Sequence, residues 1–119
     1  MRYVDTACGW LVSIIGVLHL AAGRAAFTAP SEPRIWFASA GFLLVLTGLA
    51  NLAAQGATGR MQQAAALVGS SSILILGTLM AFSDRDLLTE PQTWVLLMLG
   101  LILTVQRLRS IMGASNASR

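Results

Sequence analysis

The sequence predicts an all-α protein, a four-helix antiparallel transmembrane bundle that forms a single integral membrane domain over residues 1–119. Hydrophobic residues make up 55% of the chain and charged residues only 11%, against about 25% charged residues in ordinary soluble domains. Four stretches carry no formal charge: residues 6–23, 35–59, 61–83 and 91–106. A helix rises about 1.5 Å per residue, so about 20 residues cross the hydrocarbon layer. Each stretch is close to that length, which predicts four spans.

The spans are expected over about residues 6–27, 34–55, 61–82 and 91–109. Pro30 and Pro33 end the first span, since proline cannot continue a helix. Gly56 and Gly59 mark a short turn before the third span. Pro91 opens the fourth span, because proline is favoured in a first helical turn. A polar tail is expected from residue 112 onward, and the short connections leave no room for a soluble catalytic domain.

All basic residues are arginines, and they lie at the span ends. Since arginine and lysine accumulate on the cytoplasmic side, their distribution predicts a multi-pass protein of the bacterial cytoplasmic (inner) membrane with both termini cytoplasmic. The predicted cytoplasmic side carries Arg2, Arg60, Arg107, Arg109, Arg119 and Asp5; the outer side carries Arg24, Arg34, Arg85, Glu32, Asp84, Asp86 and Glu90. Arg107 and Arg109 are expected to extend to the headgroups. No basic cluster predicts nucleic-acid binding.

Glycines follow a seven-residue spacing in the first two spans. Gly9, Gly16 and Gly23 form one stripe, and Gly41 and Gly48 form another. Small residues on one helix face allow a second helix to approach closely, which promotes association in lipid. We therefore expect these two faces to pack against each other.

His19 lies on the first glycine stripe and is the chain's single histidine. An ionisable group inside a span is a functional candidate, and histidine suits a proton carrier, a general base, or a haem or metal ligand. The alternative is a neutral histidine hydrogen-bonded to a neighbouring helix. Cys8 is the single cysteine and no acid lies in the middle of a span, so we expect no metal site and no cofactor. Cys8 is expected to be a small buried side chain.

Other polar residues offer a choice between a binding role and a structural role. Arg24 and Glu32 bracket the first outer loop, where together with Arg34 they form either a charged lid over a pocket containing His19 or an interfacial ion pair with one spare arginine. Trp36 suits the aromatic belt of a membrane interface. Asn51 requires a partner on another helix, which the run of serines at residues 70–72 offers, either lining a polar crevice or joining helices.

Part of the chain resembles a group of known proteins. The sequence Gly-Val-Leu-His-Leu at residues 16–20, then Gly23, residues 36–37, Gly41 and Leu-Thr-Gly-Leu-Ala-Asn-Leu at residues 46–52 are similar to small four-span bacterial membrane proteins of unknown function, DoxX-like in layout. The resemblance implies a four-helix membrane bundle and singles out His19, Trp36 and Asn51. It implies no catalytic residue.

The sequence favours a non-enzymatic accessory or interaction subunit, because it lacks hydrolase, phosphate-binding and metal-binding motifs. One alternative is a homo-oligomeric small-solute or proton transporter or channel that uses His19. Another is a membrane enzyme acting on a lipid-like substrate with His19 and Glu32 as an acid–base pair. Expected partners are the lipid bilayer and either further copies of the chain or a larger membrane complex.

Overall fold

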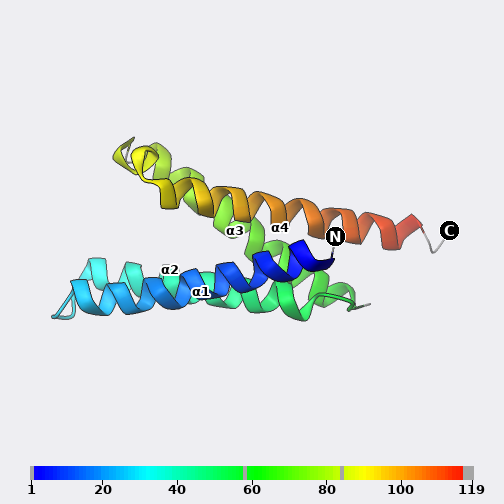
Figure 1. The fold of residues 1–119 in the computed structure, drawn as a ribbon, viewed down its shortest axis with the longest axis horizontal. Helices are drawn as coiled ribbons and strands as arrows, with labels where there is room; N and C mark the ends of the chain where they lie inside the picture. The colour runs from blue at the N-terminus through cyan, green and yellow to red at the C-terminus, as the bar shows by residue number, and fades with distance from the viewer. Residues whose placement is uncertain (1, 58, 84, 117–119) are drawn as a thin grey trace.

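Four long α-helices dominate the computed structural model of the chain, which confirms the all-α class (Figure 1). The structure describes residues 2–57, 59–83 and 85–116, so Asp84 and Arg119 lie outside the described residues, which contain no strand. Each long helix is long and apolar enough to cross a membrane. The elements are α1 (Arg2–Ala26), α2 (Glu32–Ala53), α3 (Arg60–Ser83), the short 3-10 helix η1 (Arg85–Thr89) and α4 (Pro91–Asn116).

Local chemistry accounts for the helix boundaries. Pro33 occupies the first turn of α2, where its missing N–H removes no helical hydrogen bond. After α2 ends, Gly56 adopts a φ of 75°, a left-handed conformation that glycine tolerates best. The expected tail from residue 112 was wrong for residues 112–116, which continue α4. Those residues contain no proline, and one glycine does not end a helix.

Consecutive helices run in opposite directions, as Figure 1 shows. We call one end of the bundle the terminal end: α1 begins there, α4 ends there, and residues 54–59 join α2 to α3. The other end, with residues 27–31 and η1, is the distal end. Helix α1 packs along α2, and α3 packs along α4. The two hairpins meet toward the terminal end and separate toward the distal end (Figure 1).

All four helices contribute to the hydrophobic core. Val12 of α1 and Leu103 of α4 have no exposed surface. They pack in one cluster with Cys8, Leu44, Ile73 and Leu99. This layer fixes the hairpins to each other next to the polar groups of the terminal end.

Small residues bring α1 and α2 into close contact. A side-chain carbon added at Gly48 would lie 2.6 Å from the Gly9 carbonyl oxygen, and one added at Gly16 would lie 2.7 Å from the Val45 backbone nitrogen. Gly41 faces Leu20, and Gly23 faces Phe37 in the same way. The backbones are therefore too close to admit even alanine without movement.

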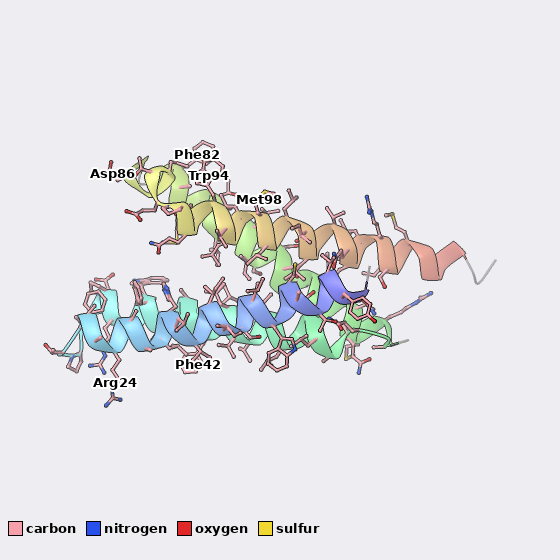
Figure 2. The ribbon with its side chains drawn as sticks, viewed as in Figure 1. Arg24, Phe42, Phe82, Asp86, Trp94 and Met98 are labelled. Atoms are coloured by element: carbon pink, nitrogen blue, oxygen red, sulfur yellow. The ribbon has the colours of Figure 1, made fainter. Side chains whose placement is uncertain are left out.

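The outer surfaces of the helices remain apolar. Figure 2 shows Trp94 and Met98 on the face of α4 turned away from α1 and α2, and Phe42 on the opposite side of the molecule. Only 22% to 33% of the most apolar window of each helix is buried inside the chain. A helix that is apolar all round needs an apolar environment, so the chain itself covers only part of its hydrophobic surface.

Candidate functional site

Arg107 of α4 lies at the centre of a buried polar cluster at the terminal end. The expectation that it extends to lipid headgroups was wrong: the residue is 2% exposed. Its Nη2 donates to Asp5 Oδ2 of α1 at 2.5 Å and to the Asn51 carbonyl oxygen of α2 at 3.1 Å. Its Nε donates to Asn51 Oδ1 at 2.9 Å, and its Nη1 donates to Gln63 Oε1 of α3 at 3.2 Å. One guanidinium therefore bonds to the three other helices.

The amides around Arg107 use their remaining donors within the same cluster. Asn51 Nδ2 donates to the Thr47 carbonyl oxygen and to Ser70 Oγ of α3, both at 2.9 Å. Gln63 Nε2 donates to the carbonyl oxygens of Ala54 and Ala57 at 2.8 and 3.1 Å. Those carbonyls follow the last turn of α2, where helical partners run out. We call Asp5, Asn51, Gln63, Ser70 and Arg107 the Arg107 cluster.

The cluster places opposite charges together away from solvent. The Arg107 side chain is 3% exposed and that of Asp5 is 17% exposed. Burying an arginine alone is unfavourable, but a hydrogen-bonded carboxylate and three amide or carbonyl oxygens replace its hydration. Asp5 also lies in the first turn of α1, where the helix dipole favours a negative charge. The Arg107–Asp5 pair is therefore expected to carry no net charge and to hold α1 and α4 together.

Five buried side-chain atoms have no hydrogen-bond partner among the described residues: Asp5 Oδ1, Thr47 Oγ1, Gln55 Nε2, Thr104 Oγ1 and Gln106 Oε1. Two of these atoms, Asp5 Oδ1 and Gln55 Nε2, belong to a carboxylate of α1 and to an amide that follows α2. The other atoms of these groups are engaged, since Asp5 Oδ2 binds Arg107 and Gln55 Oε1 accepts from Thr6 Oγ1 at 2.7 Å. Asp5 and Gln55 are therefore each only partly satisfied by the described residues.

His19 lies toward the distal end, on the face of α1 that packs against α2. Its ring stacks on Phe37, with ring centroids 3.7 Å apart and planes inclined by 4°. Within the described part of the chain it makes no hydrogen bond to a neighbouring helix, and it is half-buried. The structure thus gives His19 a packing partner on α2 and separates it from Asn51, which belongs to the Arg107 cluster.

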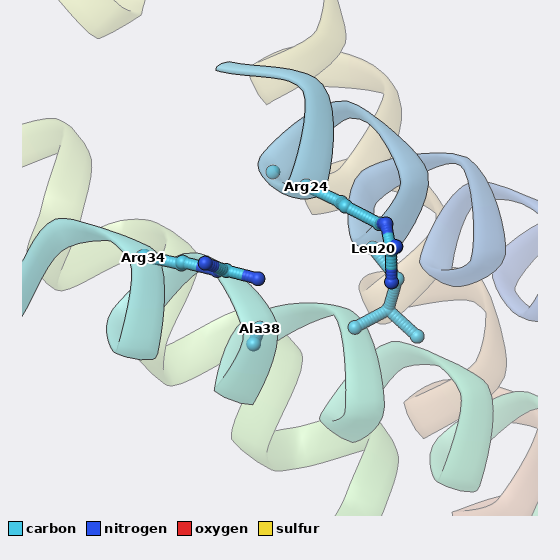
Figure 3. A pocket seen from close by; sticks show the side chains of 5 residues that line it. Leu20, Arg24, Arg34 and Ala38 are labelled. Carbon is cyan, nitrogen blue, oxygen red and sulfur yellow. The ribbon is translucent and has the colours of Figure 1, made fainter. Parts of the chain in front are cut away.

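The charged residues of the first outer loop are arranged differently from a lid over His19. Glu32 Oε1 accepts a hydrogen bond from Trp36 Nε1 at 3.4 Å, one helical turn away. Arg24 and Arg34 instead line a cavity of about 120 Å³ together with Leu20, Gly23 and Ala38 (Figure 3). Neither His19 nor Glu32 lines it. Arg24 and Arg34 therefore line the same cavity, whereas His19 and Glu32 contact different partners.

Groups suited to metal binding are not gathered in the described residues, where no three histidine, cysteine or acidic side chains lie together. Cys8 is buried in the hydrophobic core, with 6% of its surface exposed. Its thiol is therefore inaccessible to reagents in solution.

The sequence contains a pattern that indicates a buried Arg107, although the distribution of arginines along the chain suggested a headgroup position. Leu99, Leu103 and Arg107 recur every four residues, which places them on one face of a helix, and all three are buried. Gln63, Ala66 and Ser70, spaced three and four residues apart, likewise share one face of α3 and are buried. A polar residue that continues a buried apolar face is the pattern that predicts an interior position.

The described residues thus contain an arginine-lined cavity at the distal end and the Arg107 cluster at the terminal end. No protein-family model, no curated protein and no solved structure matches this chain.

Proposed function

We propose that this chain is a small, non-enzymatic accessory or interaction subunit of the bacterial inner membrane. Its membrane placement is supported by four helices that are each long and apolar enough to span. It is also supported by their outer faces, which carry exposed tryptophan, phenylalanine and leucine side chains. The DoxX-like layout belongs to this proposal and rests on the sequence alone.

The proposed topology places the terminal end in the cytoplasm. With Arg107 neutralised by Asp5, the described residues of that end still include Arg2, Arg60 and Arg109. The described residues of the distal end include three arginines and three acids: Arg24, Arg34, Arg85, Glu32, Asp86 and Glu90. The remaining arginine excess still favours cytoplasmic termini by the positive-inside rule.

The observation that carries the non-enzymatic assignment is the internal pairing of the Arg107 cluster. Arg107 donates four hydrogen bonds to three other helices. Side chains that work on a substrate must reach it in the reacting geometry, whereas these groups are buried and bound to one another. In this proposal their hydrogen bonds connect the α1–α2 hairpin to the α3–α4 hairpin.

The separation of the hairpins supports an interaction role. Beyond the core layer, α1 and α2 diverge from α3 and α4 toward the distal end (Figure 1). Large apolar side chains on these segments are exposed, among them Leu18, Ile35 and Leu79. In lipid, helices associate through close packing rather than through hydrophobic exclusion from water. The exposed apolar faces of these helices offer such packing surfaces to the helices of another subunit.

Photocrosslinking in intact membranes, followed by native mass spectrometry in a mild detergent, tests this proposal. A photoreactive residue replaces Phe42 or Met98, which lie on opposite outer faces and are 59% and 56% exposed. A control variant carries it at the exposed loop residue Thr28. We expect one foreign membrane protein to crosslink to one of the two faces and to copurify at fixed stoichiometry. A chain that yields only lipid adducts and runs alone contradicts the proposal.

A second candidate, a homo-oligomeric transporter, is favoured by one observation: the hairpins are joined at one end and open at the other. Such an arrangement allows the hairpins to rock about the Arg107 cluster. Proton or solute flux through liposomes that changes on His19→Ala substitution supports transport. Flux equal to that of empty vesicles contradicts a transport function.

The lipid-modifying reading requires His19 and Glu32 at one shared cavity. Glu32 is bonded to Trp36, and His19 is stacked on Phe37. A carboxyl group that shares no cavity with the imidazole cannot serve as its acid–base partner in this arrangement. The geometry therefore favours the accessory role over this enzyme.

A further inference from the structure

The distal cavity lies between the last turn of α1 and the first turns of α2. Arg24 lines it from α1 and Arg34 from α2. Figure 3 shows the Arg34 side chain directed toward α1, and the exposed Arg24 side chain running along α1 beside Leu20. Leu20, Gly23 and Ala38 complete its lining. Its volume of about 120 Å³ is several times the roughly 30 Å³ that one water molecule occupies in the liquid. The cavity can therefore hold a polyatomic group.

The two guanidinium groups have no counter-charge in the described part of the chain. Neither Arg24 nor Arg34 forms an ion pair or a hydrogen bond there. Glu32 is the nearest acid in sequence, but residues two apart on a helix do not face each other. Its carboxylate bonds instead to Trp36 on its own side of α2. Two positive groups thus face one cavity without an internal anion.

This combination is suited to a phosphate. Guanidinium groups bind phosphate oxygens through paired, charge-assisted hydrogen bonds. The cavity floor is apolar, because Leu20, Gly23 and Ala38 offer no polar side chain. One turn further toward the middle of the helices, exposed apolar residues share the faces that line the cavity: Val17 lies three residues before Leu20, and Phe42 lies four residues after Ala38. A phospholipid matches this arrangement, since its phosphate would lie at the arginines and its acyl chain along the apolar side chains.

We propose that the cavity between Arg24 and Arg34 binds the phosphate of an anionic phospholipid in the outer leaflet. This inference rests on the membrane placement in the proposed function, which sets the distal end at the outer headgroups. It does not require a protein partner. The bound lipid would fill the cavity and neutralise the two arginines.

Lipid titration of the full-length protein, measured by native mass spectrometry, tests this inference. The probes are phosphatidylglycerol, phosphatidylcholine and inorganic phosphate, added to delipidated protein in detergent. Arg24→Gln and Arg34→Gln are each expected to weaken phosphatidylglycerol binding about tenfold, the effect of losing one charge-assisted bond. Arg109→Gln is the matched control, since Arg109 is an exposed arginine at the terminal end. It should bind as the unmodified protein does.

The outcomes separate the lipid from other sources of phosphate. Binding that prefers phosphatidylglycerol, needs both arginines and resists competition by inorganic phosphate supports the proposal. Equal binding by the Arg24, Arg34 and Arg109 variants overturns it. Displacement of the lipid by inorganic phosphate alone overturns the lipid assignment. Arginine-dependent lipid binding by a chain that has no foreign subunit supports this site while contradicting the accessory role.

Discussion

Replacing Gly48 with alanine should separate the two helices of the first hairpin. The added carbon would lie 2.6 Å from the Gly9 carbonyl oxygen, 0.8 Å short of the 3.4 Å at which ordinary contact begins, and 2.7 Å from the Ser13 backbone nitrogen. Because both groups are backbone, α1 must shift as a unit rather than rotate a side chain. A gap of 0.5–1 Å removes about a quarter to a half of each dispersion contact.

The expected loss in free energy of unfolding follows from two opposing effects. Overpacking in a tight interface costs about 1–3 kcal/mol. Alanine regains about 0.5–1 kcal/mol over glycine in a helix interior. The difference spans about 0–2.5 kcal/mol, and we expect a net loss in its upper half because the added carbon meets backbone atoms that cannot rotate away. The loss is measured by unfolding in mixed detergent micelles with increasing SDS.

Two other glycines supply a graded control series. A carbon added at Gly100 would lie 3.3 Å from Ile73 Cγ2, while one added at Gly113 meets nothing within 4 Å. Gly100→Ala should change stability little, and Gly113→Ala should leave it equal or slightly higher. If Gly48→Ala is as stable as Gly113→Ala, the close approach of α1 and α2 is not what holds the first hairpin together.

Three further predictions concern the cluster, the core and the topology. Asn51→Leu removes the acceptor of Arg107 Nε and should lower the free energy of unfolding by about 1–3 kcal/mol, measured in the same micelles; an unchanged value would mean that this hydrogen bond adds no stability. Cys8, 6% exposed, should react with N-ethylmaleimide only after SDS unfolding, and fast labelling of folded protein would place it outside the core. In a Cys8→Ala background, Thr28→Cys should be labelled by a membrane-impermeant maleimide in whole cells and Gly59→Cys only after lysis; the reverse pattern would invert the topology.

The fold was largely predictable because the sequence patterns that specify it extend over whole helices. Charge-free stretches of helical length predicted four helices, Pro30 and Pro33 predicted the end of the first, and Pro91 predicted the beginning of the fourth. The glycine spacing at Gly9 and Gly48 reflects a contact that depends on small size alone, which a sequence displays directly. Such patterns repeat over several turns and do not depend on a single tertiary contact.

The polar sites were less predictable because they depend on how the hairpins meet. Arg107 lies near the end of a span, as a headgroup-facing arginine does, and the partners that hold it in the interior come from the three other helices. Gln63 has no distinctive motif, yet it both binds Arg107 and completes the end of α2. In the distal half, the position of Arg24 and Arg34 at one cavity depends on how α1 and α2 lie against each other. Each of these pairings joins residues from different helices.

A double-mutant cycle between Asp5 and Arg107 tests most directly that the Arg107 cluster joins the hairpins. Asp5→Asn and Arg107→Met are unfolded singly and together in SDS-containing micelles. Each single change should lower the free energy of unfolding by about 3–5 kcal/mol, because it leaves a buried charge without its partner. The double variant should lose clearly less than the sum of the two. With the exposed Arg109→Met in place of Arg107→Met, the effects should add. Additive losses for Asp5 and Arg107 as well would contradict the account.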